Sequence, residues 1–529
     1  MPPHPFDVAR TWLISASAGC GKTRSIERTI EELLKRGTKS EEIMYLLFNK
    51  IPGEEFKAKF MAKGISEDSM RWWGTHHAIA YRLMRKETGN FRVLSGKMLK
   101  EWGTPFGYRF SDEKTDEFSV SWTNETLSSL ERKIFDCRED SLTNSEQKLL
   151  DRLEDEQRSS RRFLHTMYLR GALLRDLFPK EVKYVFVDEG QDNGRIQFDY
   201  FKRLLERKQI LGFMVAGDDK QAINGFKGSS AETFLNFPAD RFVALPASYR
   251  CAQPVLDYAN RVAEKLKIRS PLARISLNPM PGEVIKFTSF YSTLPLLGSA
   301  CQNKSVLVVS RLNYILGHVK KDFRDAGIPI FSVTHDRIRS IIEIFRRIKR
   351  TGIITAVDYE FLKPNEKGAG FLKRDSYWPR GFFKNKKDEE SSDQSPLFDL
   401  SDYLSQMSAT PLEDARSLGL NPLFVSDVSS GGPPPERFRG DSDDVVYVYR
   451  MIEKYGIDYR PVMCHTVHSS KGLEADLVIV LTDISQKIEE ERRKNSDEDL
   501  RVWYVAFTRA KESLWITPYK DRGFLHFLP

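Results

Sequence analysis

The sequence predicts an α/β protein with two lobes, each built on a parallel β-sheet and each interrupted by an insertion. Short apolar runs that end in small or acidic residues recur along the chain, and a helical pattern follows each of them. Strands buried on both faces form such continuous apolar runs, and their alternation with helices is typical of a parallel sheet covered by helices. The length of 529 residues is too great for a single compact core and predicts several domains.

The apolar runs fall into two sets, which define the two predicted lobes. The first set comprises residues 12–16, 43–48, 184–187 and 213–216, and the second comprises residues 306–309, 462–466, 477–481 and 514–517. A charged segment with periodic leucines interrupts the first set, and a segment with polar breaks at 384–396 and 429–440 interrupts the second. The predicted division is a first lobe at 1–85 and 178–245, a mainly helical insertion at 86–177, a second lobe at 246–335 and 456–529, and a short second insertion with polar loops at 336–455.

The composition argues against a membrane protein, an exported protein and a protein held together by disulfides or zinc. Hydrophobic residues make up 40% of the chain and charged residues 29%, and no apolar run approaches the roughly 18 residues of a membrane span. The N-terminal residues lack the pattern of an export or transit signal, so we expect a cytoplasmic protein with no membrane partner. The five cysteines are widely spaced and form no C-x-x-C pair, which argues against a disulfide framework and a zinc site. The net charge of +8 permits a polyanionic partner but does not by itself indicate one.

A phosphate-binding loop follows the first predicted strand. Its residues are Ala16, Ser17, Ala18, Gly19, Cys20, Gly21, Lys22 and Thr23. The glycines let backbone N–H groups close around phosphates, Lys22 would reach the β and γ phosphates, and the Thr23 hydroxyl would bind Mg²⁺. An isolated match of this kind is also compatible with a strand-to-helix turn that binds no ligand.

Two adjacent acids far downstream argue against that alternative. The apolar run 184–187 leads directly into Asp188 and Glu189. Adjacent acids usually mark a solvated turn, but here an apolar strand delivers them to the carboxyl edge of the sheet, where α/β proteins bind their ligands. We predict that Asp188 holds Mg²⁺ and that Glu189 activates water for ATP hydrolysis.

Further motifs follow in a fixed order along the chain. They comprise residues 48–50, 74–77, 188–192, 217–228, 245–251, 466–474 and 504–510. Together with the phosphate loop, this series resembles the superfamily 1 DNA helicases of the UvrD/Rep type. The resemblance covers both lobes and implies two RecA-like P-loop motor domains in tandem, while the two insertions share only their positions with the family.

The resemblance also implies roles at the nucleotide site. Gln221 would sense the γ-phosphate, which Arg250 and Arg509 would approach as arginine fingers. Tyr249 would pack on adenine, Arg24 would cover the other face of the base, and Glu474 would touch the ribose. The family usually carries an adenine-reading glutamine upstream of the phosphate loop, whereas the first glutamine here is Gln147, so selectivity for adenine is not implied.

Contacts with nucleic acid follow from the same resemblance. The candidates are Phe48, Asn49, Lys50, Thr75, His77, Phe226, Lys227 and His468. Phe48 and Phe226 could instead be core aromatics, which is the less favoured interpretation. We disfavour a metal site at His76 and His77, because neighbouring side chains on a strand or turn point apart and no third ligand lies near. A basic aromatic stretch at 374–387 is better explained as a solvated loop with an apolar anchor.

These observations predict an ATP-dependent DNA helicase or translocase that uses ATP and Mg²⁺ and moves along single-stranded DNA by closure of its two lobes. The resemblance implies 3′ to 5′ polarity, with DNA junctions and proteins of repair or replication as partners. The alternatives are an RNA-directed motor, a component of a helicase–nuclease complex, or a nucleotide-switched DNA-binding or loading protein that does not unwind.

Overall fold

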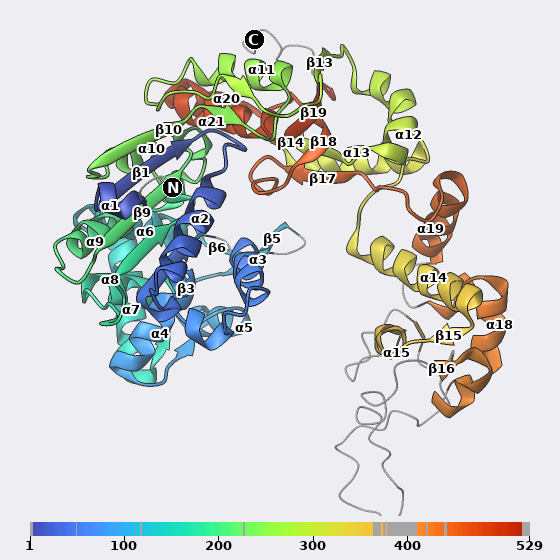
Figure 1. Ribbon diagram of the computed structural model, residues 1–529, viewed down its shortest axis with the longest axis horizontal. Coiled ribbons are helices and arrows are strands. Elements are labelled where there is room, and N and C mark those ends of the chain that lie inside the picture. Colours follow the sequence, from blue (N-terminus) through green and yellow to red (C-terminus); the bar gives the residue numbers. More distant parts are fainter. Residues whose placement is uncertain are drawn as a thin grey trace, which may run out of the picture. The chain divides into compact units, whose positions relative to one another are not determined.

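The structure is a computed structural model, and it describes residues 4–48, 50–116, 119–225, 228–362, 372–373, 377, 410–418, 420, 422–438 and 442–520. The chain divides into two compact units (Figure 1). Unit 1 comprises Met1–Ser292, Leu307–Leu316 and His465–Pro529, and unit 2 comprises Thr293–Val306 and Gly317–Cys464. The domain boundaries predicted from the sequence remain predictions. No helix within the described part of the chain has the length and apolar content needed to cross a lipid bilayer.

A six-stranded parallel sheet carries the phosphate loop in unit 1. In spatial order its strands are β10 (Arg241–Leu245), β1 (Thr11–Ala16), β9 (Gly212–Gly217), β8 (Tyr184–Val187), β2 (Ile43–Leu47) and β3 (Trp73–Thr75). The four strands predicted for the first lobe are therefore confirmed. The helices associated with this sheet are α1 (Pro5–Val8), α2 (Lys22–Lys35), α3 (Lys50–Met61), α4 (His76–Thr88), α9 (Arg195–Leu205) and α10 (Ala231–Leu235).

The central strands of this sheet are buried on both faces, and their alternate residues enter two different cores. On β8, Val185 and Val187 pack with residues of α4 and α9, whereas Phe186 packs with residues of α2 and α3. Successive side chains of a strand point to opposite faces, so this division requires apolar residues at every position. The four-residue run Tyr184–Val187 meets that requirement.

A helix-rich segment separates β3 from β8 along the chain. Its helices are α5 (Lys97–Gly103), α6 (Glu125–Phe135), α7 (Asn144–Ser160) and α8 (His165–Leu174), and its short strands are β4 (Arg92–Val93), β5 (Ser111–Asp116), β6 (Ser119–Thr123) and β7 (Arg162–Phe163). Leucines of α6 and α7, including Leu130 and Leu149, share a separate buried core. Helix α7 begins with a capping box in which Thr143 and Glu146 satisfy each other's backbone N–H groups.

A second sheet has the strand order β13 (Glu283–Lys286), β19 (Ala510–Thr517), β18 (Ala475–Leu481), β14 (Val306–Ser310) and β17 (Met463–Thr466). All four strands predicted for the second lobe are present. The pairs β13–β19 and β18–β19 are parallel. Helices α11 (Gln253–Ala263), α20 (Gln486–Lys494) and α21 (Ser496–Phe507) accompany this sheet, and β11 (Ala247–Ser248) pairs with β12 (Ile275–Ser276) nearby in the chain. With the first sheet, this arrangement confirms the predicted α/β fold class.

Unit 2 is mainly helical in its described part. Its elements are α12 (Leu294–Asn303), most of α13 (Asn313–Asp325), α14 (Val333–Thr351), β15 (Ile353–Ile354), α15 (Ala356–Leu362), β16 (Thr410–Pro411), α18 (Pro422–Ser430) and α19 (Ser442–Tyr455). Ser332 caps the start of α14, and Gly352 ends it with a φ of 67°. Helix α14 packs against α18 and α19. The predicted polar break at 384–396 lies outside the described residues, as does nearly all of the basic stretch at 374–387.

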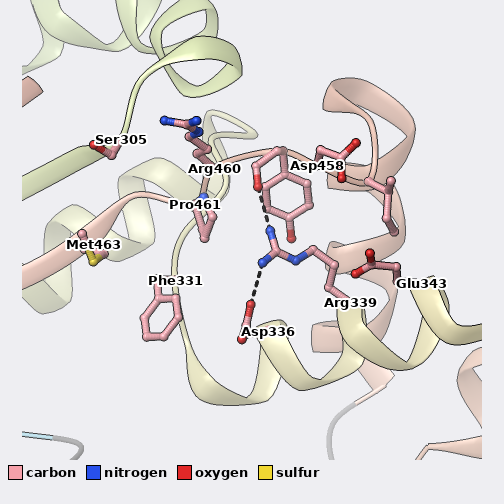
Figure 2. A pocket seen from close by; sticks show the side chains of 11 residues that line it. Ser305, Phe331, Asp336, Arg339, Glu343, Asp458, Arg460, Pro461 and Met463 are labelled. Carbon is pink, nitrogen blue, oxygen red and sulfur yellow. Dashed lines mark hydrogen bonds and ion pairs between the residues drawn. The ribbon is translucent and has the colours of Figure 1, made fainter. Parts of the chain in front are cut away.

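A pocket of about 510 Å³ lies at the start of α14 within unit 2 (Figure 2). Arg339 is one of the residues that line the pocket. The guanidinium of Arg339 donates hydrogen bonds to the Tyr459 carbonyl (2.7 Å) and the Asp336 carboxylate (2.7 Å). Its lining residues all belong to unit 2, whereas every candidate for the nucleotide site belongs to unit 1.

Candidate functional site

The phosphate loop joins β1 to α2, which begins at Lys22. Gly19 and Gly21 adopt φ angles of 71° and 83°, a region that favours glycine. Lys22 is buried, which by itself would lower its pKa, but the carboxylates of Glu189, Asp218 and Asp188 outweigh burial and raise that pKa. The loop therefore presents a charged ammonium and the N-terminus of a helix, which together favour an anion.

Gly19 also lies against the residue that follows β11. A Cβ atom added at Gly19 would come 2.3 Å from the Arg250 Cβ, and the φ of 71° would itself strain any other residue. We expect Gly19→Ala to lower the free energy of unfolding by about 2–4 kcal/mol and to weaken nucleotide binding, measured by urea unfolding and by titration with a fluorescent nucleotide.

Gly37→Ala is the matched control for this prediction. Gly37 has a φ of +91° but no atom within 4 Å of an added Cβ, so the variant carries the backbone strain without the clash. It should lose only about 1–2 kcal/mol and bind nucleotide normally. Equal losses in the two variants would refute a role for the close contact with Arg250.

The acid pair follows β8, as the sequence predicts. The Asp188 carboxylate accepts hydrogen bonds from the Thr23 hydroxyl (2.7 Å) and the Tyr45 hydroxyl (3.1 Å). Burial, together with the charge of Glu189, raises the pKa of Asp188. A cation would relieve that cost, and a hydroxyl touching a carboxylate is a hard oxygen pair that suits Mg²⁺. Thr23 and Asp188 therefore fit the predicted metal.

Glu189 is held in an unusual backbone conformation, with a φ of 51°. Burial would raise the pKa of its carboxyl group, but the charges of Lys22 and Lys471 lower that pKa to about 2. Glu189 is therefore ionised at neutral pH, as a proton acceptor must be.

A chain of hydrogen bonds links Glu189 to Arg509. Gln191 Nε2 donates to Glu189 Oε2 (2.6 Å), and the backbone N–H of Asp218 donates to Gln191 Oε1 (2.8 Å). Gln221 Nε2 donates to Asp218 Oδ2 (2.7 Å), and Arg509 Nη2 donates to Gln221 Oε1 (2.9 Å). The acid and an arginine that are 320 positions apart in the sequence thus belong to one buried network.

Arg509 is almost fully buried. Besides Gln221, its guanidinium donates to the carbonyls of Val505 (3.0 Å) and Leu473 (3.2 Å). Burial and the nearby charge of Arg250 lower the pKa of Arg509 to about 10, so it remains charged at neutral pH.

Tyr249, a predicted base contact, and Glu474, the predicted ribose contact, line a cleft of about 440 Å³ beside Gly19. Tyr249 is 67% exposed in this cleft. Arg250 forms an ion pair with Glu474 (2.6 Å), and both of these side chains line the cleft together with Tyr249. Arg24 instead pairs with Glu27 on α2 (2.8 Å) and is not among the described residues that line the cleft.

The candidates for nucleic-acid contact lie in several elements. Thr75 caps α4 by accepting a hydrogen bond from the Ala78 N–H (3.2 Å), and His77 lies against His165 and Tyr168. Phe48 is half-buried after β2, Lys50 begins α3, and His468 is exposed in the turn after β17. Asn49, Phe226 and Lys227 lie outside the described residues.

The prediction that His76 and His77 lie on a strand or turn is wrong, because Thr75 caps a helix that begins at His76. His76 is buried and packs on Phe201. Burial and the neighbouring His77 lower the pKa of His76 to about 3. His76 is therefore a neutral core residue.

Sequence reasoning missed an ion pair that joins two of the motifs. Lys471 Nζ lies 2.6 Å from the Asp192 carboxylate and donates to the Gln221 carbonyl (3.0 Å). Asn224 donates to the same carboxylate (3.0 Å). Lys471 lies three residues after His468, whereas Asp192 follows Glu189 and Gln191. The motif 466–474 already contained Lys471, but nothing local in the sequence names Asp192 as its partner.

The parallel sheets, the phosphate loop and the buried acid–arginine network define the class of P-loop motor proteins. Comparison with known proteins identifies the family. The model of the UvrD/REP helicase N-terminal domain matches residues 5–167 and 161–241, and the model of the UvrD-like helicase C-terminal domain matches residues 450–521. Together they cover more than half of the chain, which therefore belongs to the UvrD/REP helicase family and is a helicase, an enzyme of the hydrolase class.

Individual relatives agree with this assignment. The chain is 22% identical to an ATP-dependent DNA helicase PcrA of Staphylococcus epidermidis, over 96% of this chain and 81% of the relative. It is 22% identical to a DNA helicase II of Rickettsia typhi, over 67% of this chain and 63% of the relative. A DNA helicase II of Salmonella typhimurium is 25% identical over 48% of this chain and 38% of the relative.

Proposed function

We propose that this helicase hydrolyses ATP to move 3′ to 5′ along single-stranded DNA and to separate duplex strands. The buried network from Glu189 to Arg509 carries the proposal, because it joins an ionised acid, a γ-phosphate sensor and an arginine beside a phosphate loop. The relatives named as ATP-dependent DNA helicases support the choice of nucleotide and of nucleic acid. The polarity follows only from the family resemblance.

In this proposal the reaction uses positioning and charge more than covalent chemistry. Lys22 and the loop N–H groups hold the phosphates, and Glu189 accepts the proton of the attacking water. Arg250 and Arg509 stabilise the charge that develops on the transferring phosphoryl group. Thr23 and Asp188 would hold Mg²⁺, which neutralises charge on the β and γ phosphates when it is bound.

We further propose that nucleotide turnover opens and closes the two lobes and so alternates their grip on the strand. The lobe of the first sheet supplies Lys22 and Glu189, and the lobe of the second sheet supplies Arg509. Lys471 supports a link between DNA binding and hydrolysis, because it contacts both Asp192 and the Gln221 carbonyl and lies three residues from the DNA-contact candidate His468.

The proposal is tested by measuring ATP hydrolysis without nucleic acid, with single-stranded DNA and with single-stranded RNA. We expect DNA to increase the rate strongly and RNA to increase it much less. Strand displacement should then occur on duplexes with a 3′ single-stranded tail and not on those with a 5′ tail. Equal rates with and without DNA would instead support a nucleotide-switched binding protein, and a stronger response to RNA would support an RNA-directed motor.

A further inference from the structure

One carboxylate in the nucleotide cleft neutralises two cations. Arg250 Nε lies 2.6 Å from Glu474 Oε2, and Lys511 Nζ lies 3.0 Å from Glu474 Oε1. All three side chains line the cleft that contains Gly19 and Tyr249. Each is partly exposed, at 20% for Arg250, 38% for Glu474 and 36% for Lys511. The charged groups at the ends of these three side chains can therefore reorient without disturbing the hydrophobic core.

The main chain of Arg250 is fixed beside the phosphate loop. The Tyr249 N–H donates to the Gly19 carbonyl (2.9 Å), and the Ser248 hydroxyl donates to the Ala18 carbonyl (2.8 Å). The Arg250 Cβ also leaves no room for a side chain at Gly19. Because its main chain is fixed, Arg250 can exchange Glu474 for a bound phosphate only by rotating its side chain, which would break the contact between its Nε and Glu474.

The main chain of Lys511 is equally fixed. Its carbonyl accepts hydrogen bonds from the Ala252 N–H (2.7 Å) and from Asn278 Nδ2 (3.0 Å). Lys511 therefore keeps its ammonium within reach of Glu474 whichever way Arg250 points.

The Glu474 carboxylate would be a partly buried charge without a partner if both cations moved away from it. Burial would raise the pKa of its carboxyl group, but Arg250 and Lys511 lower that pKa, so the group stays ionised. When Arg250 turns to a phosphate, Glu474 loses one of its two counter-charges while facing a polyanion. A partly buried charge without a partner is costly, and like charges at close range repel.

We propose that Lys511 is a positioning residue for ATP hydrolysis, because it keeps Glu474 neutralised while Arg250 exchanges that carboxylate for the γ-phosphate. This inference rests on the proposed function. Lys511 would act through Glu474 without contacting the nucleotide. Its loss should therefore change the affinity only for nucleotides that carry a γ-phosphate.

The test compares nucleotide affinities of wild type, Lys511→Met and Lys511→Arg. We expect Lys511→Met to weaken a non-hydrolysable ATP analogue by about three- to tenfold, as for a charged hydrogen bond that is partly solvent-exposed, and to leave ADP affinity within about twofold. Lys511→Arg should restore the wild-type ratio of the two affinities. Lys35→Met, at an exposed position on α2, is the control and should change neither affinity.

A double-mutant cycle with Glu474→Gln checks the mechanism. Once the carboxylate is removed, Lys511→Met should have little further effect on the ATP-analogue affinity. Additive effects would overturn the inference, as would equal weakening of ADP and the ATP analogue. An unchanged Lys511→Met variant would overturn it while leaving the proposed function intact, provided that wild type hydrolyses ATP. A wild type that does not hydrolyse ATP would refute the proposed function itself.

Discussion

Glu189→Gln should reduce ATP hydrolysis by about a hundred- to a thousandfold while preserving nucleotide binding. A positioned general base typically contributes that much, and an amide cannot accept the proton of the attacking water. The substitution keeps the shape of the side chain, and its amide oxygen can still accept the hydrogen bond that Gln191 donates to Glu189 Oε2. The loss should therefore appear in kcat, measured with saturating single-stranded DNA, and not in the melting temperature.

Glu232→Gln is the matched control for this substitution. Glu232 is an exposed acid on α10, in the same sheet-bearing part of unit 1. The control variant should hydrolyse ATP at the wild-type rate. If Glu189→Gln retained more than about a tenth of the wild-type rate, Glu189 would not be the general base.

Much of the fold could be predicted because its central strands need apolar residues on both faces. The runs that became β1, β2, β8 and β9 meet that requirement. The strands that sequence reasoning missed in the two sheets are β3, β10 and β13, each at an edge. Edge strands are only partly covered, so Arg241–Leu245 begins with exposed residues and Glu283–Lys286 is exposed at both ends. Hydrophobicity is then too weak a guide.

Some residues of the candidate site could likewise be predicted from the sequence, and others could not. The phosphate loop and the acid pair could be located because each motif is contiguous and lies at the end of an apolar strand. The partners of those residues could not be located, because Lys471 and Asp192 are 279 positions apart. Pairing across the fold depends on tertiary packing that no local pattern encodes. Lys511 was missed for the same reason, since its partner Glu474 lies on another segment.

We expect Arg509→Lys to lower kcat by at least about a hundredfold, although the substitution keeps the positive charge. Arginine fingers contribute about a thousandfold or more to phosphoryl transfer, and a lysine restores only part of that effect. The guanidinium of Arg509 donates to Gln221, Val505 and Leu473 through three different nitrogens. A single ammonium cannot satisfy these three acceptors in the same geometry, so Gln221 should also lose its orientation.

Arg493→Lys, on an exposed arginine of α20, should leave kcat unchanged and serves as the control. Because Gln221 accepts from Arg509 and donates to Asp218, the variants Arg509→Lys and Gln221→Met should be strongly non-additive in kcat. Additive effects would mean that the two side chains act separately. In that case the hydrogen bonds from Glu189 to Arg509 would have only a structural role, and the proposed coupling between the acid and the arginine would be refuted.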